Sequence, residues 1–214
     1  MEVIQNFLRI KNQISVLNSK TKLIAVSKGQ SIEKIKLLID SGHLDFGENK
    51  VQEATLKWSD IVSGNKNINL HLIGGLQSNK AKDAFKIFNY IHSLDSEKLA
   101  RIFSDLEKNN SKKIKYFIQV NIGNEIQKNG LNISFVSDFV QYCKNDLKLN
   151  ILGLMCIPPV NKPPESYFLK LKKLNDDNNL KDLSMGMSDD YEIAIKLGST
   201  FVRVGTAIFG KRSN

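Results

Sequence analysis

Short apolar runs alternate with amphipathic stretches along the whole chain. The apolar runs are typical of buried strands, and the stretches between them repeat apolar residues at helical spacing. The predicted strands cover residues 23–28, 44–49, 69–74, 90–95, 115–122, 149–157, 182–187 and 200–205. The predicted helices cover residues 1–19, 31–42, 50–60, 78–86, 96–109, 132–145, 163–175 and 189–198. Apolar strands joined by helices indicate parallel strand pairing, with the helices outside.

This alternation is typical of an α/β fold, the (β/α)8 TIM-type barrel, which usually needs about 250 residues. With 214 residues the predicted barrel is lean and leaves little room for a second domain. We therefore expect residues 1–214 to form a single domain. The extra helix at 1–19 should pack outside the barrel, over the last strand. An open, doubly wound sheet is the alternative.

The composition is that of a globular protein, with 41% hydrophobic and 25% charged residues. No apolar run approaches the roughly 20 residues of a membrane span, and the N-terminus lacks the apolar stretch of a signal peptide. Cys143 and Cys156 lie in different kinds of segment, without histidines at metal-ligand spacing. We expect a cytoplasmic protein without a disulfide, a metal site or a membrane partner.

The net charge of +9 raises the possibility of nucleic-acid binding. The lysines are scattered among acidic residues, however, as in SEKLARIFSDLEKNNSKKIK, and no aromatic–basic alternation provides a stacking platform. We therefore expect no nucleic-acid partner. A small phosphorylated ligand remains compatible with the charge.

The carboxyl ends of barrel strands are where active sites lie. Lys28 ends the first predicted strand in LIAVSK, Asn49 ends the second in FGEN, and His92 lies near the end of the fourth. Lys28 alone would read as a solvated strand end, but the barrel places it at the functional rim. Asn49 could contact a ligand or only close a turn.

The last two strand–helix units contain a candidate phosphate site. In SMGMSDD, Ser188 is expected to cap the helix that begins near Asp189; in RVGTAIFG, Gly205 and Thr206 form the turn after the last strand. Backbone N–H groups, a glycine that allows close approach and two hydroxyls favour phosphate, and barrels commonly bind it here. The alternative is that Ser188 only caps its helix.

Arg203 is a guanidinium within an apolar strand. Alternation places Phe201, Arg203 and Gly205 on one face. If that face points into the barrel, Arg203 needs an acceptor, either a buried Asp or Glu or a heteroaromatic ligand nitrogen. A lysine, a phosphate site and an arginine on one rim suggest pyridoxal 5′-phosphate (PLP). A Schiff-base aldolase would also use a lysine and a phosphate site, with less need for Arg203.

The motifs AVSK, FGEN, HLIGGLQSNK, GLMCIPP, SMGMSDD and GSTFVRVGTAIFG resemble those of the pyridoxal phosphate homeostasis protein family, from about residue 22 to 212. The resemblance implies the barrel of the alanine racemase N-terminal domain without that enzyme's second domain. It also implies PLP binding without established catalytic activity, and a role in intracellular vitamin B6 and amino-acid homeostasis.

The resemblance further implies a set of cofactor-binding residues, which are Lys28, Asn49, Ser188, Arg203, Gly205 and Thr206. Lys28 matches the lysine that forms a covalent Schiff base with PLP. Arg203 matches the arginine that faces the pyridine nitrogen, and Asn49 lies beside the cofactor. The other three match phosphate-binding positions. No catalytic residue is implied.

Three further positions qualify this match. Ser184 is a less secure neighbour of the cofactor, and Lys128 in QKNG matches a lysine described as a secondary PLP contact. Gln30 stands where many members have a second lysine, so PLP exchange here is expected to differ if that lysine assists it.

The main alternative function is a fold-type III, PLP-dependent racemase-like enzyme. Such an enzyme takes a second acid/base from a separate β-domain, which the chain is not expected to contain. An arginine at the ring nitrogen would also weaken the electron sink. We expect a monomer whose ligand is PLP and whose partners include PLP-requiring apoenzymes.

Overall fold

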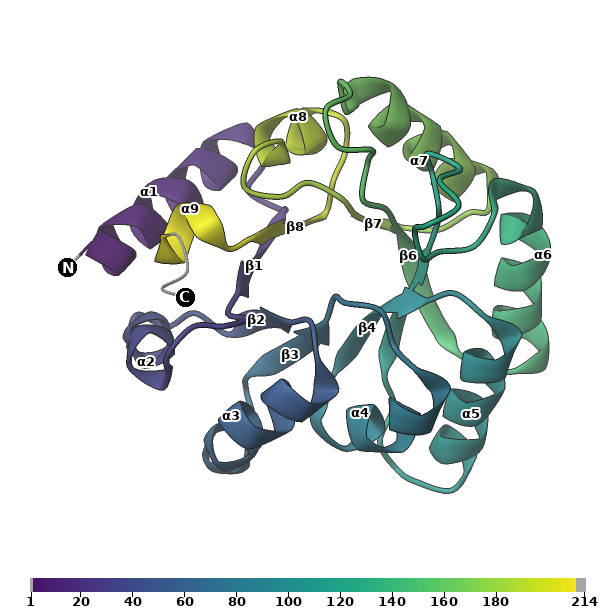
Figure 1. Cartoon of the computed structure of the whole chain (residues 1–214), viewed down its shortest axis with the longest axis horizontal. Coiled ribbons are helices and arrows are strands. Elements are labelled where there is room, and N and C mark those ends of the chain that lie inside the picture. Colours follow the sequence, from purple (N-terminus) through teal and green to yellow (C-terminus); the bar gives the residue numbers. More distant parts are fainter. Residues whose placement is uncertain (1, 211–214) are drawn as a thin grey trace.

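A computed structural model describes residues 2–210, and in it eight parallel strands close into a barrel in sequence order (Figure 1). The strands are β1 (Lys22–Val26), β2 (Asp45–Glu48), β3 (Asn69–Leu72), β4 (Tyr90–Leu94), β5 (Lys115–Gln119), β6 (Asn150–Met155), β7 (Asp182–Ser184) and β8 (Phe201–Val204). The predicted (β/α)8 barrel is confirmed, and the open sheet is wrong.

Every strand ends one to three residues earlier than predicted, for example at Val26 rather than Lys28. Small and apolar residues continue past the strand ends, and several of them, such as Ser27, Val120 and Met185, are buried. The difference matters for the site, since it places Lys28 on a loop and not on a strand.

The helices form the outer layer of the barrel (Figure 1). They are α1 (Glu2–Leu17), α2 (Ile32–Asp40), α3 (Val51–Gly64), α4 (Ala81–Ile87), α5 (Glu97–Lys108), α6 (Val136–Gln141), α7 (Glu165–Asp177), α8 (Tyr191–Lys196) and α9 (Thr206–Phe209). Short 3-10 turns cover Ser78–Lys80 and Ile133–Phe135, and a π-helical turn covers Tyr142–Asp146. The helix predicted over 132–145 is therefore divided into three pieces, and α9 had no counterpart in the prediction.

Helix α1 packs outside the barrel beside α8, α9 and α2, as expected for the N-terminal helix (Figure 1). Its buried residues Phe7, Ile10 and Ile14 follow the helical spacing seen in the sequence. Because α9 after β8 spans only 206–209, α1 covers the part of the outer layer that a longer last helix would occupy. Residue 1 of the predicted helix lies outside the described residues.

The barrel has a small interior cluster, distinct from the large core between strands and helices. The interior cluster consists of Ile24, Tyr90, Phe117, Met155 and Phe201. Val202 and Val204 belong to the outer core instead. The alternation predicted for β8 is therefore correct, and it brings Phe201 and Arg203 to the barrel interior.

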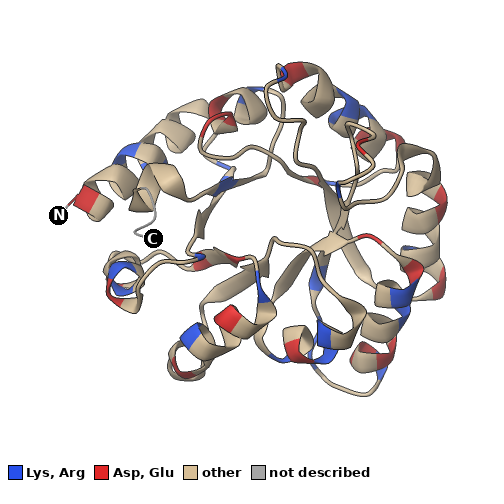
Figure 2. Ribbon diagram, viewed as in Figure 1, with Lys and Arg blue, Asp and Glu red and all other residues tan. Residues whose placement is uncertain are grey.

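Charged residues lie mainly on the outer helices, where Lys and Arg are interspersed with Asp and Glu (Figure 2). Several form helical ion pairs, such as Lys172 with Asp176. Across residues 2–210, no helix is long and apolar enough to cross a membrane. Cys143 and Cys156 are both buried and free.

Candidate functional site

The predicted site residues come from four consecutive strands of the barrel, β7, β8, β1 and β2. Parallel strands bring all their carboxyl ends to one mouth. Lys28 follows β1, Asn49 follows β2, and Ser188 lies in the turn after β7. Gly205 and Thr206 directly follow β8. The structure thus brings the predicted residues to one side of a single mouth, with Arg203 just inside it.

The loop that carries Lys28 is anchored by Glu48, a fully buried carboxylate at the end of β2. Its Oε1 atom accepts hydrogen bonds from Ser27 Oγ at 2.8 Å and from Trp58 Nε1 at 2.9 Å. Lys57 Nζ lies 2.9 Å from the same oxygen. The residue before Lys28 is therefore fixed to β2 and to α3.

The residue after Lys28 is held by a second carboxylate. Gly29 has a φ of +67°, in the left-handed region that favours glycine, and its N–H donates to Glu53 Oε1 at 2.6 Å. Lys57 Nζ also bonds Glu53 Oε1 at 2.8 Å and the Ser27 carbonyl at 2.8 Å. Burial acts to raise the pKa of Glu53, but the Gly29 N–H and Lys57 hold it below its usual value. Lys28 itself is half-buried between these anchored neighbours.

Sequence reasoning had missed this support. Glu48 stands inside the FGEN motif, and Glu53 and Lys57 are four residues apart on one predicted helix. That spacing is the signal that could have indicated an ion pair on one helix face. It could not have indicated that the pair reaches across to the loop after β1.

Asn49 is positioned by a close backbone approach from the loop after β3. A Cβ atom at Gly74 would lie 2.3 Å from the Asn49 carbonyl oxygen, so only glycine allows this packing. The Oδ1 atom of Asn49 is buried and has no hydrogen-bond partner in the described part of the chain. Among the described residues, Gln119 Oε1 is likewise buried without a hydrogen-bond partner. Asn49 and Gln119 both line a mouth cavity of about 330 Å³. Two buried acceptors thus remain available to a ligand.

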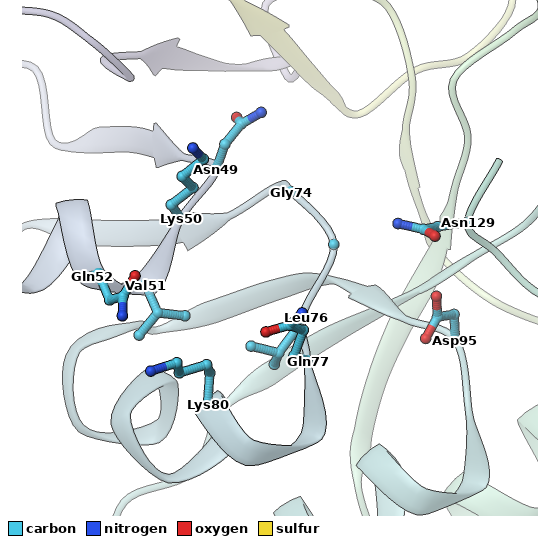
Figure 3. A pocket seen from close by; sticks show the side chains of 11 residues that line it. Asn49, Lys50, Val51, Gln52, Gly74, Leu76, Gln77, Lys80, Asp95 and Asn129 are labelled. Carbon is cyan, nitrogen blue, oxygen red and sulfur yellow. The ribbon is translucent and has the colours of Figure 1, made fainter. Parts of the chain in front are cut away.

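A larger, polar cavity of about 690 Å³ adjoins the first on the side of β2 and β3. Figure 3 shows Asn49 and Asn129 on opposite sides of the loop at Gly74, with Lys50 and Lys80 on the side of α3 and α4. The mouth therefore stays open beside Asn49.

Ser188 does not cap α8, so that part of the prediction is wrong. Helix α8 begins at Tyr191 with Asp190 as its N-cap, because residues 188–190 form a turn in which Asp190 Oδ1 accepts from the Met187 N–H at 2.6 Å. The Ser188 hydroxyl instead accepts from the N–H groups of Gly205 and Ala207, both at 3.3 Å.

This turn creates a group of donors after β8. The backbone N–H groups of Gly205 and Ala207 converge on the Ser188 hydroxyl oxygen, and Thr206 between them is exposed. Gly205 lies close to β1, since a Cβ atom there would be 3.2 Å from the Val26 carbonyl oxygen. Such converging N–H groups favour an anion.

Arg203 is only 3% exposed, and its partners within the protein are not the buried Asp or Glu that was one of the two predicted acceptors. Nη1 donates to Ser184 Oγ at 2.7 Å, and Nη2 donates to the Cys156 carbonyl at 2.9 Å. Among residues 2–210, no carboxylate lies within ion-pair distance of this guanidinium. Burial lowers the pKa of Arg203, which reflects the cost of a buried cation with neutral acceptors.

The two further positions that the resemblance singles out, Lys128 and Gln30, both make hydrogen bonds within the protein. Lys128 Nζ pairs with Glu125 Oε2 at 2.6 Å and donates to the Pro158 carbonyl at 3.0 Å. Gln30 accepts a hydrogen bond from Lys34 on α2. Lys128 and Asn49 both line the smaller mouth cavity.

Comparison with known proteins gives the same family from sequence and from structure. Residues 2–213 match the family of the alanine racemase N-terminal domain. The pyridoxal phosphate homeostasis protein of Pasteurella multocida is 35% identical over 221 aligned residues, which cover 99% of this chain and 95% of that one. The corresponding protein of Haemophilus influenzae is 37% identical, covering 90% of this chain and 85% of that one.

Solved structures share the fold. PipY of Synechococcus elongatus, determined with PLP bound, is 32% identical with a TM-score of 0.80, covering 94% of this chain and 100% of that chain. Alanine racemase of Bartonella henselae has a TM-score of 0.77 at 16% identity, covering 99% of this chain and 59% of that chain. The second likeness concerns the fold alone.

Proposed function

The chain belongs to the family of the alanine racemase N-terminal domain, and from that premise we propose that it binds PLP at this mouth for homeostasis of the cofactor. One observation carries the proposal. A lysine, a group of converging N–H donors and a buried arginine stand at the ends of neighbouring strands. These groups suit the aldehyde, the phosphate and the ring nitrogen of PLP, respectively.

Each residue has a proposed role. The Lys28 amine condenses with the aldehyde, releases one water and holds the cofactor covalently as a Schiff base. Ser188, Gly205 and Thr206 bind the phosphate, and Arg203 donates to the ring nitrogen. When bound, PLP supplies an electrophilic aldehyde, and the surrounding residues determine how tightly it is retained.

The described contacts fit this ligand. A phosphate oxygen can take the place of Ser188 Oγ as acceptor for the N–H groups of Gly205 and Ala207. Arg203 lies close to neutral acceptors only, so a ring nitrogen adds an acceptor without displacing a carboxylate. The buried Oδ1 atom of Asn49 offers an acceptor for a polar ligand hydrogen.

We propose further that the protein is not an enzyme. A guanidinium that donates to the ring nitrogen keeps that nitrogen unprotonated, which weakens the electron sink that amino-acid chemistry requires. We also propose that residues 1–214 form a single barrel and that the protein is a monomer in the cytoplasm. In this proposal it transfers PLP to PLP-requiring apoenzymes.

Titration with PLP and with pyridoxal, which lacks the phosphate, tests the binding. A saturable visible absorption band is expected with PLP, and much weaker binding with pyridoxal. Absence of such a band with PLP would refute the proposed function. Incubation of the loaded protein with L-alanine tests the non-catalytic part, because sustained formation of D-alanine above the rate with free PLP would make the protein a racemase.

A further inference from the structure

Five polar side chains form an unbroken line of hydrogen bonds through the barrel interior. Arg203 Nη1 lies 2.7 Å from Ser184 Oγ, which lies 2.8 Å from His92 Nδ1. His92 Nε2 lies 3.0 Å from His71 Nδ1, and His71 Nε2 lies 3.1 Å from Asp45 Oδ1. The line joins the residue that we assign to the cofactor's ring nitrogen to a carboxylate at the start of β2.

The two ends of this line lie at opposite ends of the barrel. Arg203, Ser184, His92 and His71 are each at most 3% exposed. Asp45 is the first residue of β2, and its side chain is 22% exposed. It lines a cavity of about 280 Å³ at the amino-terminal end of the strands.

Neutral imidazoles fix the direction of the donors in this line. A guanidinium only donates and an ionised carboxylate only accepts. With both rings neutral, the Ser184 hydroxyl donates to His92 Nδ1, His92 Nε2–H to His71 Nδ1, and His71 Nε2–H to Asp45. Each gap then contains one hydrogen.

The surroundings favour this arrangement. Tyr90 stacks on His71 with ring centroids 4.1 Å apart, and Phe117 stacks on His92 at 4.4 Å, so both rings have fixed planes. Burial lowers the pKa of each histidine. For His71, the contact with Asp45 opposes this effect, whereas for His92 the electrostatic fields of His71 and Arg203 add to it. Both rings are therefore neutral near pH 7.

Asp45 is the anion of the line. Burial acts to raise its pKa, but the hydrogen bond from His71 and the charge of Lys22 hold it below its usual value. Asp190 attracts Arg203 only from beyond ion-pair distance. The line thus begins at a buried cation without an adjacent carboxylate and ends at an ionised carboxylate.

We propose that Asp45, His71, His92 and Ser184 are positioning residues that fix the guanidinium of Arg203 and balance its charge from the opposite end of the barrel. Aligned hydrogen bonds polarise one another, so the Asp45 charge strengthens each donor–acceptor pair up to Arg203. The line itself stands on the described contacts. Its effect on the cofactor's ring nitrogen rests on the proposed function.

Imidazole ¹⁵N spectra of the cofactor-free protein test the line directly. The chain has three histidines, and His43→Gln assigns the signals of the one outside the line. At pH 7.5, His71 and His92 should both be neutral with the hydrogen on Nε2. A hydrogen on Nδ1 of either ring, or an imidazolium, would overturn the proposal, whether or not the protein binds PLP.

Asp45→Asn tests the effect on the cofactor, because the amide oxygen can still accept from His71 while the charge is lost. PLP affinity should fall about fivefold or more, the lower end of typical coupling between sites, and the visible band of bound PLP should shift. Asp83→Asn removes an equally charged but exposed carboxylate on α4 and should leave both unchanged. Equal affinities and spectra in the two variants would contradict the proposal.

The variant Ser184→Ala interrupts the line next to Arg203. In that background, Asp45→Asn should have no further effect on PLP affinity, since coupled residues are not additive. An undiminished effect would show that Asp45 does not act through the line. If wild type shows no PLP band, the proposed function fails, and the imidazole spectra alone test whether the line of hydrogen bonds is arranged as proposed. The same spectra test the line if a variant does not fold.

Discussion

The two sides of the mouth are held in different ways. On the side of β1 and β2, Lys28 lies on a loop whose neighbouring residues are fixed from outside the barrel by Glu48, Glu53 and Lys57. On the side of β7 and β8, Arg203 lies within a strand and is contacted inside the barrel by neutral groups, Ser184 Oγ and the Cys156 carbonyl.

The difference follows from where each side chain leaves the backbone. The Arg203 backbone is fixed by its pairing with Ile24 of β1 and by the hydrogen bond of its N–H to the Gly186 carbonyl. Lys28 lies beyond the last residue of β1, so its position depends on ion pairs and hydrogen bonds from the outer layer. The comparison predicts that the two sides fail under different perturbations.

The largest effect is expected on the β1–β2 side, from Glu48→Ala. The change leaves the Lys57 ammonium and the Trp58 N–H without their buried acceptor, so the free energy of unfolding should fall by about 3–5 kcal/mol. Denaturant unfolding measures it. Glu97→Ala, which breaks an exposed pair with Arg101, should cost less than about 1 kcal/mol. A loss for Glu48→Ala as small as that of the control would show that the network does not fix the loop.

Mild acid should lower the free energy of unfolding, because buried histidines lie in the barrel interior and at its amino-terminal end. Burial lowers the pKa of His43 to about 4, against an ordinary value near 6.5, so the unfolded chain binds a proton in this range that the folded chain does not. Stability is therefore full above about pH 6.5 and is lost as the pH falls.

His43 alone should cost about 2 kcal/mol of unfolding free energy by pH 5. His71 and His92, whose pKa values burial also lowers, add to the loss. Unfolding curves from pH 8 to pH 5 measure the loss. His43→Gln should reduce the slope of the unfolding free energy against pH by the contribution of one proton. A stability that stays level down to pH 5 would contradict neutral, buried histidines.

A smaller effect is expected from Ser188→Ala. Loss of one hydroxyl that binds a charged phosphate should weaken PLP binding by about 1.5 kcal/mol, roughly tenfold. Binding of pyridoxal should not change, because it lacks the phosphate. Equal losses for PLP and pyridoxal, measured by the visible titration, would place Ser188 elsewhere than at the phosphate.

The sequence was sufficient to predict the barrel and the residues at its mouth. Alternating apolar strands and amphipathic helices depend on local patterns, and the carboxyl ends of parallel strands meet by topology. Strand ends were less certain, because residues such as Ser27 and Met187 remain apolar or small beyond the ladder. Ser188 was predicted to cap α8, because a serine before two aspartates fits a helix N-cap as well as the turn at residues 188–190 that the structure shows.

Contacts between side chains on non-adjacent strands could not be predicted. His92 was placed at a strand end, but it is the third residue of β4 and lies inside the barrel. Its bond to Ser184 joins residues 92 positions apart, and no local pattern encodes that distance. The bond from Ser27 to Glu48 that supports Lys28 connects neighbouring strands, but its partners are 21 positions apart, so no local pattern encodes it either.

Peptide mass mapping after borohydride reduction of the PLP-loaded protein tests the central claim most directly. Reduction fixes the cofactor to the amine that holds it, and we expect the phosphopyridoxyl mass on the peptide with Lys28. Lys28→Ala should lose the adduct yet retain some PLP through Ser188, Gly205 and Thr206. A phosphopyridoxyl mass on Lys128 or another lysine, with Lys28 unmodified, would contradict the account.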